Sequence, residues 1–392
     1  MLDADPQSLG LSPEGLARID RTLADLIAAG ELAGAVTLVA RHGKVAHRSV
    51  QGMKDLSSAE PLKFDTIFRI FSMTKAVTAV AMMILREEGL WAPEDLVSKH
   101  LPEFEGVKTL GGVAAAPTLL HLLTHTMGLG YGWNPEDPVD AAYLAKGVWG
   151  QGSLADMSKA IAACPLGFVP GSQWRYSLGM DLQGAIIETL SGMSLPDFMG
   201  EKIFKPLGMV DTDFFVPAEK MPRLATLYRM SKTKGLTTSN LPIIARGPEA
   251  IPPLPGGGGG LFSTVTDYAR FAQMLLNRGE LEGVRIISPE SVAEMTAQQL
   301  SPDLLAGGYG IGLQQIRPGY GQAYNGAVFH DPAAAGSKVG RGTYQWDGAA
   351  GTWFWVDWET DLIFVGLIQR MAEEGTPHLQ AITQDLIAEA LG

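Results

Sequence analysis

The chain has 392 residues, of which 46% are hydrophobic and 18% charged, a composition that excludes a disordered chain. Its length suits either one large α/β domain or two lobes. Lysine and arginine number 30 against 42 aspartates and glutamates, and the formal net charge of −12 argues against nucleic acid or an anionic membrane as a partner.

The sequence shows no targeting signal, and we therefore expect a cytoplasmic protein. The single cysteine, Cys164, allows no internal disulfide bond, which fits a reducing compartment. Residues 1–5 lack the basic start and the apolar core of a signal peptide, although a mature exported chain would look similar. The most apolar helix-like run, 79–85, is far too short to span a bilayer.

The predicted elements begin with a helix over residues 13–29, whose apolar residues recur at helical spacing. Two β-rich runs, 35–40 and 44–50, flank a glycine and predict a hairpin. Residues 74–88 are apolar almost all round a helix, which is typical of a helix buried inside a protein.

The middle of the chain, residues 93–300, shows mostly helix and loop signals. Its clearest helical segments are 121–126, 180–191 and 266–277. Residues 252–260 include five consecutive glycines, which have no side chains to pack. This stretch predicts a loop that is flexible or closely approached by other groups.

The end of the chain returns to strands and closes with a helix. Strands are predicted over 309–316, 342–346, 352–357 and 361–369, and a final helix over about 378–391. Strands at both ends imply one sheet built from the two chain ends, with an inserted helical lobe. The lobes are then residues 1–92 with 300–392, and residues 93–299, with an active site in the cleft between them.

The pattern S-x-x-K, which can supply a nucleophile and a nearby amine, occurs twice, at Ser72 with Lys75 and at Ser231 with Lys234. One chance match is unsurprising in a chain of this size, so context must separate the two. Ser231 lies in the polar, non-periodic segment 230–240, which predicts a solvated loop. The G-x-S-x-G elbow of α/β-hydrolases is absent from the chain.

Ser72 lies where the short apolar segment 67–71 meets the buried helix. A serine at a helix start has free backbone N–H groups and the positive end of the helix dipole close by. Lys75 shares its helix face, and an apolar setting favours a neutral amine that can take or relay a proton. The alternative is a helix-capping serine with a lysine whose amine reaches solvent.

Two further segments can complete a site around Ser72. Tyr176 lies at the edge of a turn before the helix predicted at 180–191 and could point into the cleft, although a lone tyrosine is more often core packing. Residues 345–351 combine a strand end with glycines and alanines, which let a substrate approach closely. A backbone N–H there would complete an oxyanion hole with that of Ser72.

In this order and spacing, these elements resemble the serine β-lactamase and DD-peptidase superfamily, and above all the family VIII carboxylesterases, which look like class C β-lactamases. The resemblance covers most of the chain and is carried by residues 68–75, 121–126, 206–209 and 258–261. It implies an α/β (α+β) fold of the β-lactamase/DD-peptidase type. Such a fold has an antiparallel sheet built from both chain ends and flanked by helices, plus an inserted, mostly helical lobe.

The resemblance implies that Ser72 is the acylated nucleophile, with Lys75 beside it and Tyr176 as the tyrosine of the second motif. In lactamases that motif reads Y-x-N, whereas Leu178 stands in its third place here, as in many of the esterases. Tyr176 and Lys75 would share the removal of the Ser72 proton, and would then activate the water that hydrolyses the acyl-enzyme.

Trp346, Asp347 and Gly348 occupy the place of the lactamase K-T-G motif, where the esterases usually show W-G-G. Ala349 then supplies the oxyanion-hole N–H together with Ser72, and Trp346 and Gly348 line the substrate site. Trp346 lacks the charge that binds a substrate carboxylate, so it favours neutral esters over β-lactams. Asp347 either places a negative charge near the substrate or points outward, as strand alternation permits.

The remaining candidates have less specific interpretations. Tyr131 and Trp133 follow a glycine-rich turn and could line the acyl or alcohol pocket. His121 and His125 have the spacing of metal ligands on a helix, but no third ligand is evident and structural roles are preferred. Trp174 is expected in the core.

We therefore expect a serine carboxylesterase that acts on small or short-chain esters, possesses weak β-lactam hydrolysis at most, and needs no cofactor or metal. Its expected partner is a small-molecule ester. The alternatives that the sequence leaves open are a β-lactamase or D-amino-acid peptidase or amidase, an acyltransferase that uses the same acyl-enzyme, and a binding module without catalysis.

Overall fold

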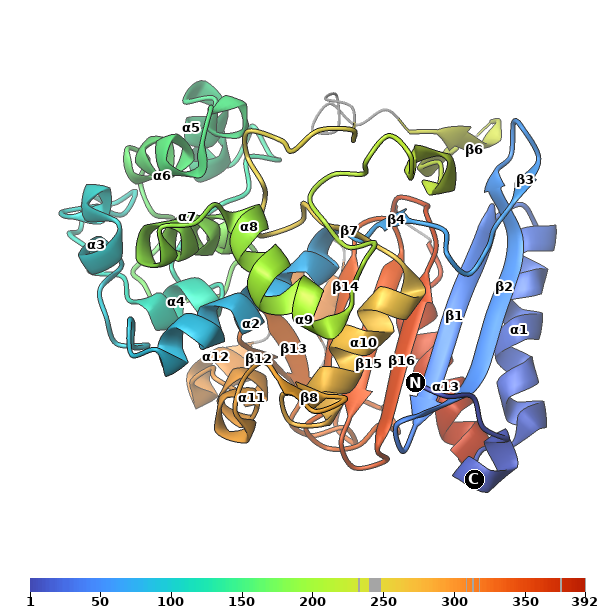
Figure 1. The fold of residues 1–392 in the computed structure, drawn as a ribbon. Coiled ribbons are helices and arrows are strands. Elements are labelled where there is room, and N and C mark those ends of the chain that lie inside the picture. Colours follow the sequence, from blue (N-terminus) through green and yellow to red (C-terminus); the bar gives the residue numbers. More distant parts are fainter. Residues whose placement is uncertain are drawn as a thin grey trace.

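The computed structural model describes residues 1–231, 233–239, 248–307, 309–311, 314–316, 318–373 and 376–391. At its centre lies an eight-stranded antiparallel sheet with the strand order β12-β13-β14-β15-β16-β1-β2-β3 (Figure 1). Its strands are β1 (Gly34–Arg41), β2 (Lys44–Asp55), β3 (Glu60–Pro61), β12 (Tyr320–Ala323), β13 (Gly326–Phe329), β14 (Tyr344–Gly348), β15 (Thr352–Asp357) and β16 (Leu362–Leu367). Strands from the two ends of the chain form one sheet, which confirms the predicted fold class.

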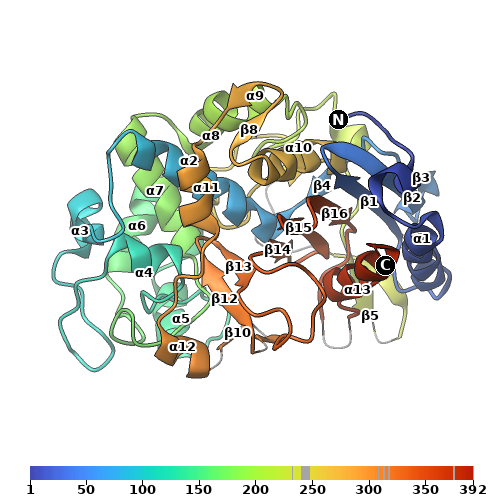
Figure 2. The same cartoon turned by 90° about the horizontal axis from the view of Figure 1, so that it is seen from below.

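Helices cover both faces of this sheet. α1 (Pro13–Ala28) and α13 (Leu379–Leu391) lie on one face, and α10 (Val265–Leu276) lies on the other (Figure 2). Side chains of β15 alternate between them: Trp353 donates its indole N–H to Thr383 of α13 over 3.1 Å, whereas Phe354 packs on Tyr268 of α10. Because both faces are covered, every residue of β15 and β16 is buried.

A second group of helices stands beside the sheet (Figure 1). Its members are α2 (Thr74–Glu87), α3 (Val97–His100), α4 (Leu119–Leu123), α5 (Pro138–Ala145), α6 (Leu154–Ala162), α7 (Gly179–Ser191), α8 (Leu195–Met199), α9 (Lys205–Leu207), α11 (Pro289–Thr296) and α12 (Pro302–Gly307). α2 packs against α7 and α11, and all its residues from Thr74 to Leu85 are buried, as its apolar sequence predicts. α10 belongs by its sequence position to the helical lobe predicted over residues 93–299, yet it packs on the sheet. The predicted lobe boundaries stay a prediction.

One edge of the sheet differs from the prediction. β12 and β13 extend the sheet beyond β14 but are only four residues long and contain Gly321 and Gly326, so they lack a recognisable pattern. The single strand predicted over 309–316 is wrong. Its described residues form two short strands, β10 (Tyr309–Ile311) and β11 (Gln314–Ile316), which pair with each other outside the main sheet.

The segment around the second S-x-x-K match is also not the predicted loop. β5 (Tyr228–Ser231) pairs with β6 (Gly235–Thr238) in a hairpin, with Met230 opposite Leu236. Ser231 is the last residue of β5, and positions 232 and 240 lie outside the described residues. The hairpin stands apart from the main sheet, and its short polar strands give no alternation that a sequence could reveal.

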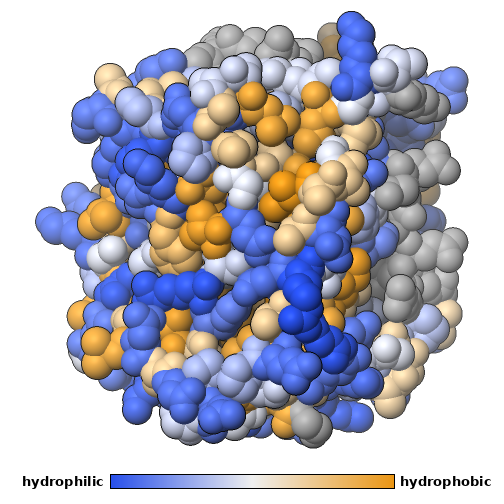
Figure 3. Space-filling view, turned by 90° about the vertical axis from the view of Figure 1, so that its right-hand side faces the viewer, coloured by the Kyte–Doolittle hydropathy of each residue, from blue (hydrophilic) through white to orange (hydrophobic). Residues whose placement is uncertain are grey.

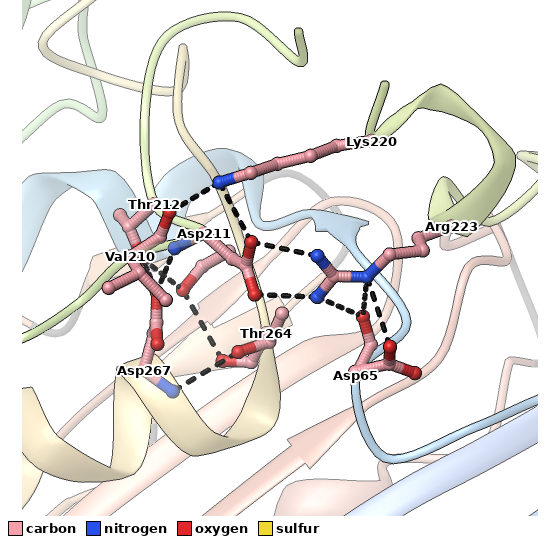
Figure 4. A network of polar contacts seen from close by, with 9 residues as sticks. Asp65, Val210, Asp211, Thr212, Lys220, Arg223, Thr264 and Asp267 are labelled. Atoms are coloured by element: carbon pink, nitrogen blue, oxygen red, sulfur yellow. Dashed lines mark hydrogen bonds and ion pairs between the residues drawn. The ribbon is translucent and has the colours of Figure 1, made fainter. Parts of the chain in front are cut away.

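A network of charges ties the segment after α9 to α10 and to the chain before β4 (Phe68–Arg69) (Figure 4). Arg223 forms a two-pronged ion pair with Asp211 and donates to the Asp65 carbonyl. Lys220 also pairs with Asp211. Asp267, in the first turn of α10, accepts the Asp211 N–H over 2.7 Å, and burial raises the pKa of Asp267 to about 6. The network fixes the approach of the chain to the turn that carries Ser72.

The face at the β2 edge mixes apolar and polar residues. Seen from the side of β2 and β3, hydrophobic residues gather in its upper part and hydrophilic side chains cross below them (Figure 3). β2, which lies next to the short edge strand β3, exposes Val50 and Met53 but also carries Arg48 and Lys54 in ion pairs, and such charges near a sheet edge hinder pairing with another chain. None of the helices that the structure describes is long and apolar enough to cross a membrane.

The glycine-rich stretch is a closely approached loop. Residues 256–260 lie between α2 and α7, just before β7 (Phe262–Ser263), which pairs with β4. A Cβ atom on Gly257 would overlap the Met180 carbonyl oxygen, and one on Gly260 would lie 2.8 Å from the Phe214 ring. The Gly257 carbonyl accepts a hydrogen bond from Thr78 over 2.7 Å. The sequence predicted a loop that is either flexible or closely approached by other groups. These contacts support the second alternative.

We expect Gly257→Ala to lower the free energy of unfolding by about 1–3 kcal/mol, the usual cost of overpacking, because its methyl group would meet a helix backbone that cannot retreat. Gly200→Ala is the matched control, since a Cβ atom at Gly200 has no neighbour within 4 Å. Denaturant melts of both variants measure the difference. Equal stability of the two variants would contradict the close approach.

Candidate active site

Ser72 lies in a strained turn at the start of α2. The turn is a short 3₁₀ segment, Phe71–Met73, and Phe71 adopts a φ of 44°, which a bulky residue rarely does. Strain of this kind persists only where the surroundings enforce it and is common at functional sites. The Ser72 hydroxyl does not cap α2, because it bonds instead to two side chains described below. The capping alternative is therefore wrong.

The hydroxyl of Ser72 is hydrogen-bonded to Tyr176 and Lys75. Its Oγ lies 2.8 Å from the Tyr176 hydroxyl and accepts from the Lys75 ammonium over 3.2 Å. Lys75 also donates to the Tyr131 hydroxyl over 3.3 Å and to the Gly258 carbonyl. Lys75 is fully buried, so its amine does not reach solvent, and this alternative is also wrong. Ser72 and Tyr176 are half-buried.

This constellation has the geometry of an activated nucleophile. Two polar groups within hydrogen-bond reach of Ser72 Oγ can receive its proton. Lys75 lies 4.9 Å from the Tyr176 ring centroid, so its charge would stabilise a phenolate there. The arrangement can thus remove a serine proton without a histidine. The structure places Ser72, Lys75 and Tyr176 together, and their catalytic roles stay a prediction.

Tyr131 and Trp133 form an aromatic wall beside this cluster. Their rings stack with centroids 3.9 Å apart, and the Tyr131 ring lies 5.4 Å from that of Tyr176. Tyr131 is buried, and burial raises its pKa well above the usual value, which keeps the phenol neutral. Trp133 is 62% exposed, so the wall continues from Lys75 to the protein surface.

An ion-pair cluster that the sequence did not reveal holds this wall in place. Asp140 accepts the backbone N–H groups of Tyr131 and Trp133 at 2.9 and 3.1 Å. Arg175, next to Tyr176, pairs with Asp140 and Asp137. Arg175 therefore links the two segments that carry the site tyrosines. Asp140, near the start of α5, and Arg175, beside Tyr176, are visible in the sequence. The sequence does not show that they form an ion pair.

The buried His125 ring packs against the Tyr176 ring. The two ring centroids lie 4.8 Å apart, and Nδ1 of His125 accepts the Ser177 N–H over 3.2 Å. Burial lowers the pKa of His125 well below the usual value, so the ring is neutral. His125 has a φ of 60° and follows the end of α4, while His121 sits within α4 and accepts the Thr118 N–H. The expected common helix is thus wrong, because the left-handed residue turns the chain.

The structure also bears on metal binding and on the position of Trp174. Within the described ranges, no group of three or more histidine, cysteine, aspartate or glutamate side chains could hold a metal ion. Trp174 is half-buried rather than in the core, and its indole N–H donates to Gln322 of β12 over 3.2 Å. It stacks beside Tyr176 with ring centroids 6.4 Å apart, so it belongs to the aromatic surroundings of the site.

β14 forms the side of the site opposite the tyrosines. Trp346 is buried with its ring centroid 6.0 Å from that of Tyr176. A Cβ atom on Gly348 would overlap the carbonyl oxygen of Ile70, so the strand end fits against the Ser72 turn only because residue 348 is glycine. Ala349 follows directly, next to this turn. Its N–H as the second oxyanion donor remains a prediction.

Asp347 lies on the other face of the sheet. It is paired directly with Trp353, whose side chain reaches α13 on the face away from the site. Directly paired residues of antiparallel strands share a face, and neighbours along a strand alternate. Of the two placements considered for Asp347, the structure therefore favours the outward one.

The sequence and the fold are similar to those of known proteins. A family model described as beta-lactamase matches residues 19–389. Protein Rv1367c of Mycobacterium tuberculosis is 36% identical over 355 residues, covering 87% of this chain and 86% of that protein. Esterase EstB of Burkholderia gladioli is 33% identical over 374 residues, covering 89% and 90%. The solved structure of EstCE1, a hydrolase with promiscuous acyltransferase activity, matches with a TM-score of 0.81 and 26% identity, covering 96% of this chain and 99% of that one.

We expect a fluorophosphonate probe, which labels activated serines, to modify Ser72 and no other serine. Ser72→Ala should abolish labelling, because the Tyr176 and Lys75 contacts exist only at this hydroxyl. Ser231→Ala, at the end of the β5 hairpin, is the matched control and should leave labelling intact. Mass spectrometry of the labelled peptide checks both, with circular dichroism to confirm folding. Labelling that survives Ser72→Ala would refute the assignment.

Proposed function

Because the chain belongs to the beta-lactamase family, we propose that Ser72 hydrolyses small, neutral carboxylic esters through a covalent acyl-enzyme. The hydrogen-bonded group of Ser72, Tyr176 and Lys75 is the observation that carries this proposal. The similarity to EstB and EstCE1 confirms the resemblance to family VIII carboxylesterases and favours an enzyme over a binding module.

In the first half-reaction, Ser72 Oγ attacks the ester carbonyl carbon while its proton passes to the Tyr176–Lys75 pair. The N–H groups of Ser72 and Ala349 hold the developing oxyanion, the usual task of such donors. When the tetrahedral intermediate collapses, the C–O bond to the alcohol breaks and the alkoxide takes the proton back from the pair. The acyl group remains on Ser72.

In the second half-reaction, a water molecule takes the place of the alcohol. The same pair removes its proton, the water oxygen attacks the acyl carbonyl, and the oxyanion forms again in the same place. Collapse of this intermediate releases the acid and returns the proton to Ser72 Oγ, so each group ends the cycle as it began.

The side chains around the cluster favour a neutral substrate. Tyr131, Trp133, Trp174 and Trp346 present aromatic surfaces around Tyr176. Aromatic walls stabilise apolar acyl or alcohol groups by burial but do not compensate for the lost hydration of a carboxylate. A small-molecule ester is thus the proposed partner, and a cytoplasmic location remains a prediction from the sequence.

Acyl transfer to an alcohol is a second candidate function. EstCE1 is described as a hydrolase with promiscuous acyltransferase activity. The aromatic wall that runs to the exposed Trp133 offers an apolar alcohol a surface that water cannot use. Product analysis with a vinyl ester in the presence of an alcohol distinguishes the two functions: the transferase reading requires the new ester to exceed the free acid.

We expect Lys75→Ala and Tyr176→Phe each to lower kcat on p-nitrophenyl acetate by at least about a hundredfold, because each removes a group that contacts Ser72 Oγ. The double variant should be far less than multiplicatively worse, since the two groups act as one unit. Steady-state kinetics of the three variants measure this. Strictly multiplicative losses would show two independent roles.

We expect p-nitrophenyl acetate to have a higher kcat/KM than nitrocefin, whose β-lactam carries a free carboxylate. Trp346→Lys should narrow the gap by about tenfold to a hundredfold, the value of one charge-assisted contact. Asp347→Gly is the matched control and should not change the ratio, because Asp347 lies on the far face of the sheet. If nitrocefin is the better substrate of the parent protein, the esterase proposal fails and the lactamase alternative replaces it.

A further inference from the structure

A buried carboxylate lies beside the cluster and has no part in the mechanism above. Asp181 occupies the first turn of α7 and is 2% exposed. Its Oδ1 accepts the Gly258 N–H over 3.2 Å, while its buried Oδ2 has no hydrogen-bond partner among the described residues. Burial raises the pKa of Asp181 to about 6, while the charge of Lys75 and the Gly258 N–H act in the opposite direction. Burying a carboxylate with an unbonded oxygen costs free energy, and such groups are common at functional sites.

One residue of the glycine loop, Gly258, connects Asp181 to Lys75. The N–H of Gly258 points to Asp181, and the carbonyl of the same residue accepts from the Lys75 ammonium. The loop can approach the acid only because it lacks side chains: a Cβ atom on Gly256 would lie 3.0 Å from Oδ1, and one on Gly258 would lie 2.7 Å from Oδ2. Two of the five glycines, Gly256 and Gly258, therefore leave the room that the carboxylate occupies.

Several titratable groups lie near Asp181, and they differ in charge. Lys75 comes from α2, which packs against α7, and His125 follows α4, which also packs there. Burial keeps His125 as the neutral imidazole and Tyr131 as the neutral phenol. Tyr176 is the reacting partner of Ser72. Lys75 is therefore the charge that Asp181 faces.

We propose that Asp181 is a positioning residue, which fixes the Gly258 carbonyl against Lys75 and keeps Lys75 as an ammonium ion throughout the reaction. Tyr176 is then the group that exchanges the proton with Ser72, while Lys75 retains its three hydrogens and stabilises the Tyr176 phenolate. This inference rests on the proposed function and goes further, because it separates the tasks of two residues that act as one unit.

Asp267 provides a matched control. Like Asp181, it is the third residue of its helix, is about 3% exposed, accepts a backbone N–H, and has a pKa raised by burial to about 6. It differs in its surroundings, since it faces Asp211 and Lys220 in the network of Figure 4 and has no contact with Lys75. Asp267→Asn therefore reproduces the structural cost of the substitution without the charge effect.

The experiment compares Asp181→Asn with Asp267→Asn by pH profiles of kcat for p-nitrophenyl acetate and of the fluorophosphonate labelling rate. Asp181→Asn should lower the plateau kcat at least about tenfold with KM within about twofold. Loss of the negative charge also favours proton loss from the Lys75–Tyr176 pair, so the acid limb should move to lower pH by about half a unit or more. Asp267→Asn should match the parent in both respects.

A parent-like plateau and acid limb in Asp181→Asn, or equal changes in both variants, would overturn the inference. If Asp181→Asn does not fold, Gly258→Ala replaces it. The added methyl group displaces the Asp181 carboxylate, while Asp181 keeps its negative charge. That variant should lose kcat, and unchanged kcat would equally overturn the inference. If the parent does not hydrolyse the ester, but Asp181→Asn lowers the plateau labelling rate at least about tenfold and Asp267→Asn does not, the proposed function fails and the role of Asp181 stands.

Discussion

The site depends on the burial of one ammonium group. Lys75 lies on a helix whose neighbouring residues are apolar and buried, and removing such a charge from water costs several kcal/mol unless its protons are bonded. Three acceptors meet that demand: the hydroxyls of Ser72 and Tyr131 and the carbonyl of Gly258. Each comes from a different segment, so solvating the lysine also fixes the geometry of the nucleophile. This constraint explains why a loop without side chains must lie against α2.

The sheet supplies the opposite side of the site, and its topology makes that possible. Strands from both chain ends form one sheet, which brings β14 next to the turn that holds Ser72 although the two are far apart in sequence. The contact is close at Gly348, where any side chain would overlap the Ile70 carbonyl oxygen. The backbone, rather than a side chain, thus sets the distance between the nucleophile and the strand edge. If the Ala349 N–H is the second oxyanion donor, as proposed, this fixed distance means that it needs no reorganisation when charge develops.

Local sequence patterns predicted most of the secondary-structure elements, whereas contacts between distant segments could not be predicted from the sequence. The apolar helix that carries Lys75, the hairpin and the two central strands have periodicities that a single sequence reveals, and the S-x-x-K pattern located the nucleophile candidate. β12 and β13 are too short to show a period. The turn at His125 depends on a left-handed residue, and the half-buried Trp174 donates to Gln322 of a strand that the sequence did not predict. Nothing local shows that Asp181 faces the glycine loop, since an acid on a helix is ordinarily assigned to solvent.

The same balance of charge bears on the choice of substrate. If Asp181 compensates Lys75 through Gly258, the formal charges of these two groups sum to zero. Trp346 adds none, and the aromatic rings around Tyr176 offer no donor array for a carboxylate. An anionic substrate entering there would lose hydration without gaining a partner, whereas a neutral ester loses little. Reactivity and selectivity then have one cause, because the carboxylate that holds the lysine in its working state also cancels the positive charge that would attract an acid.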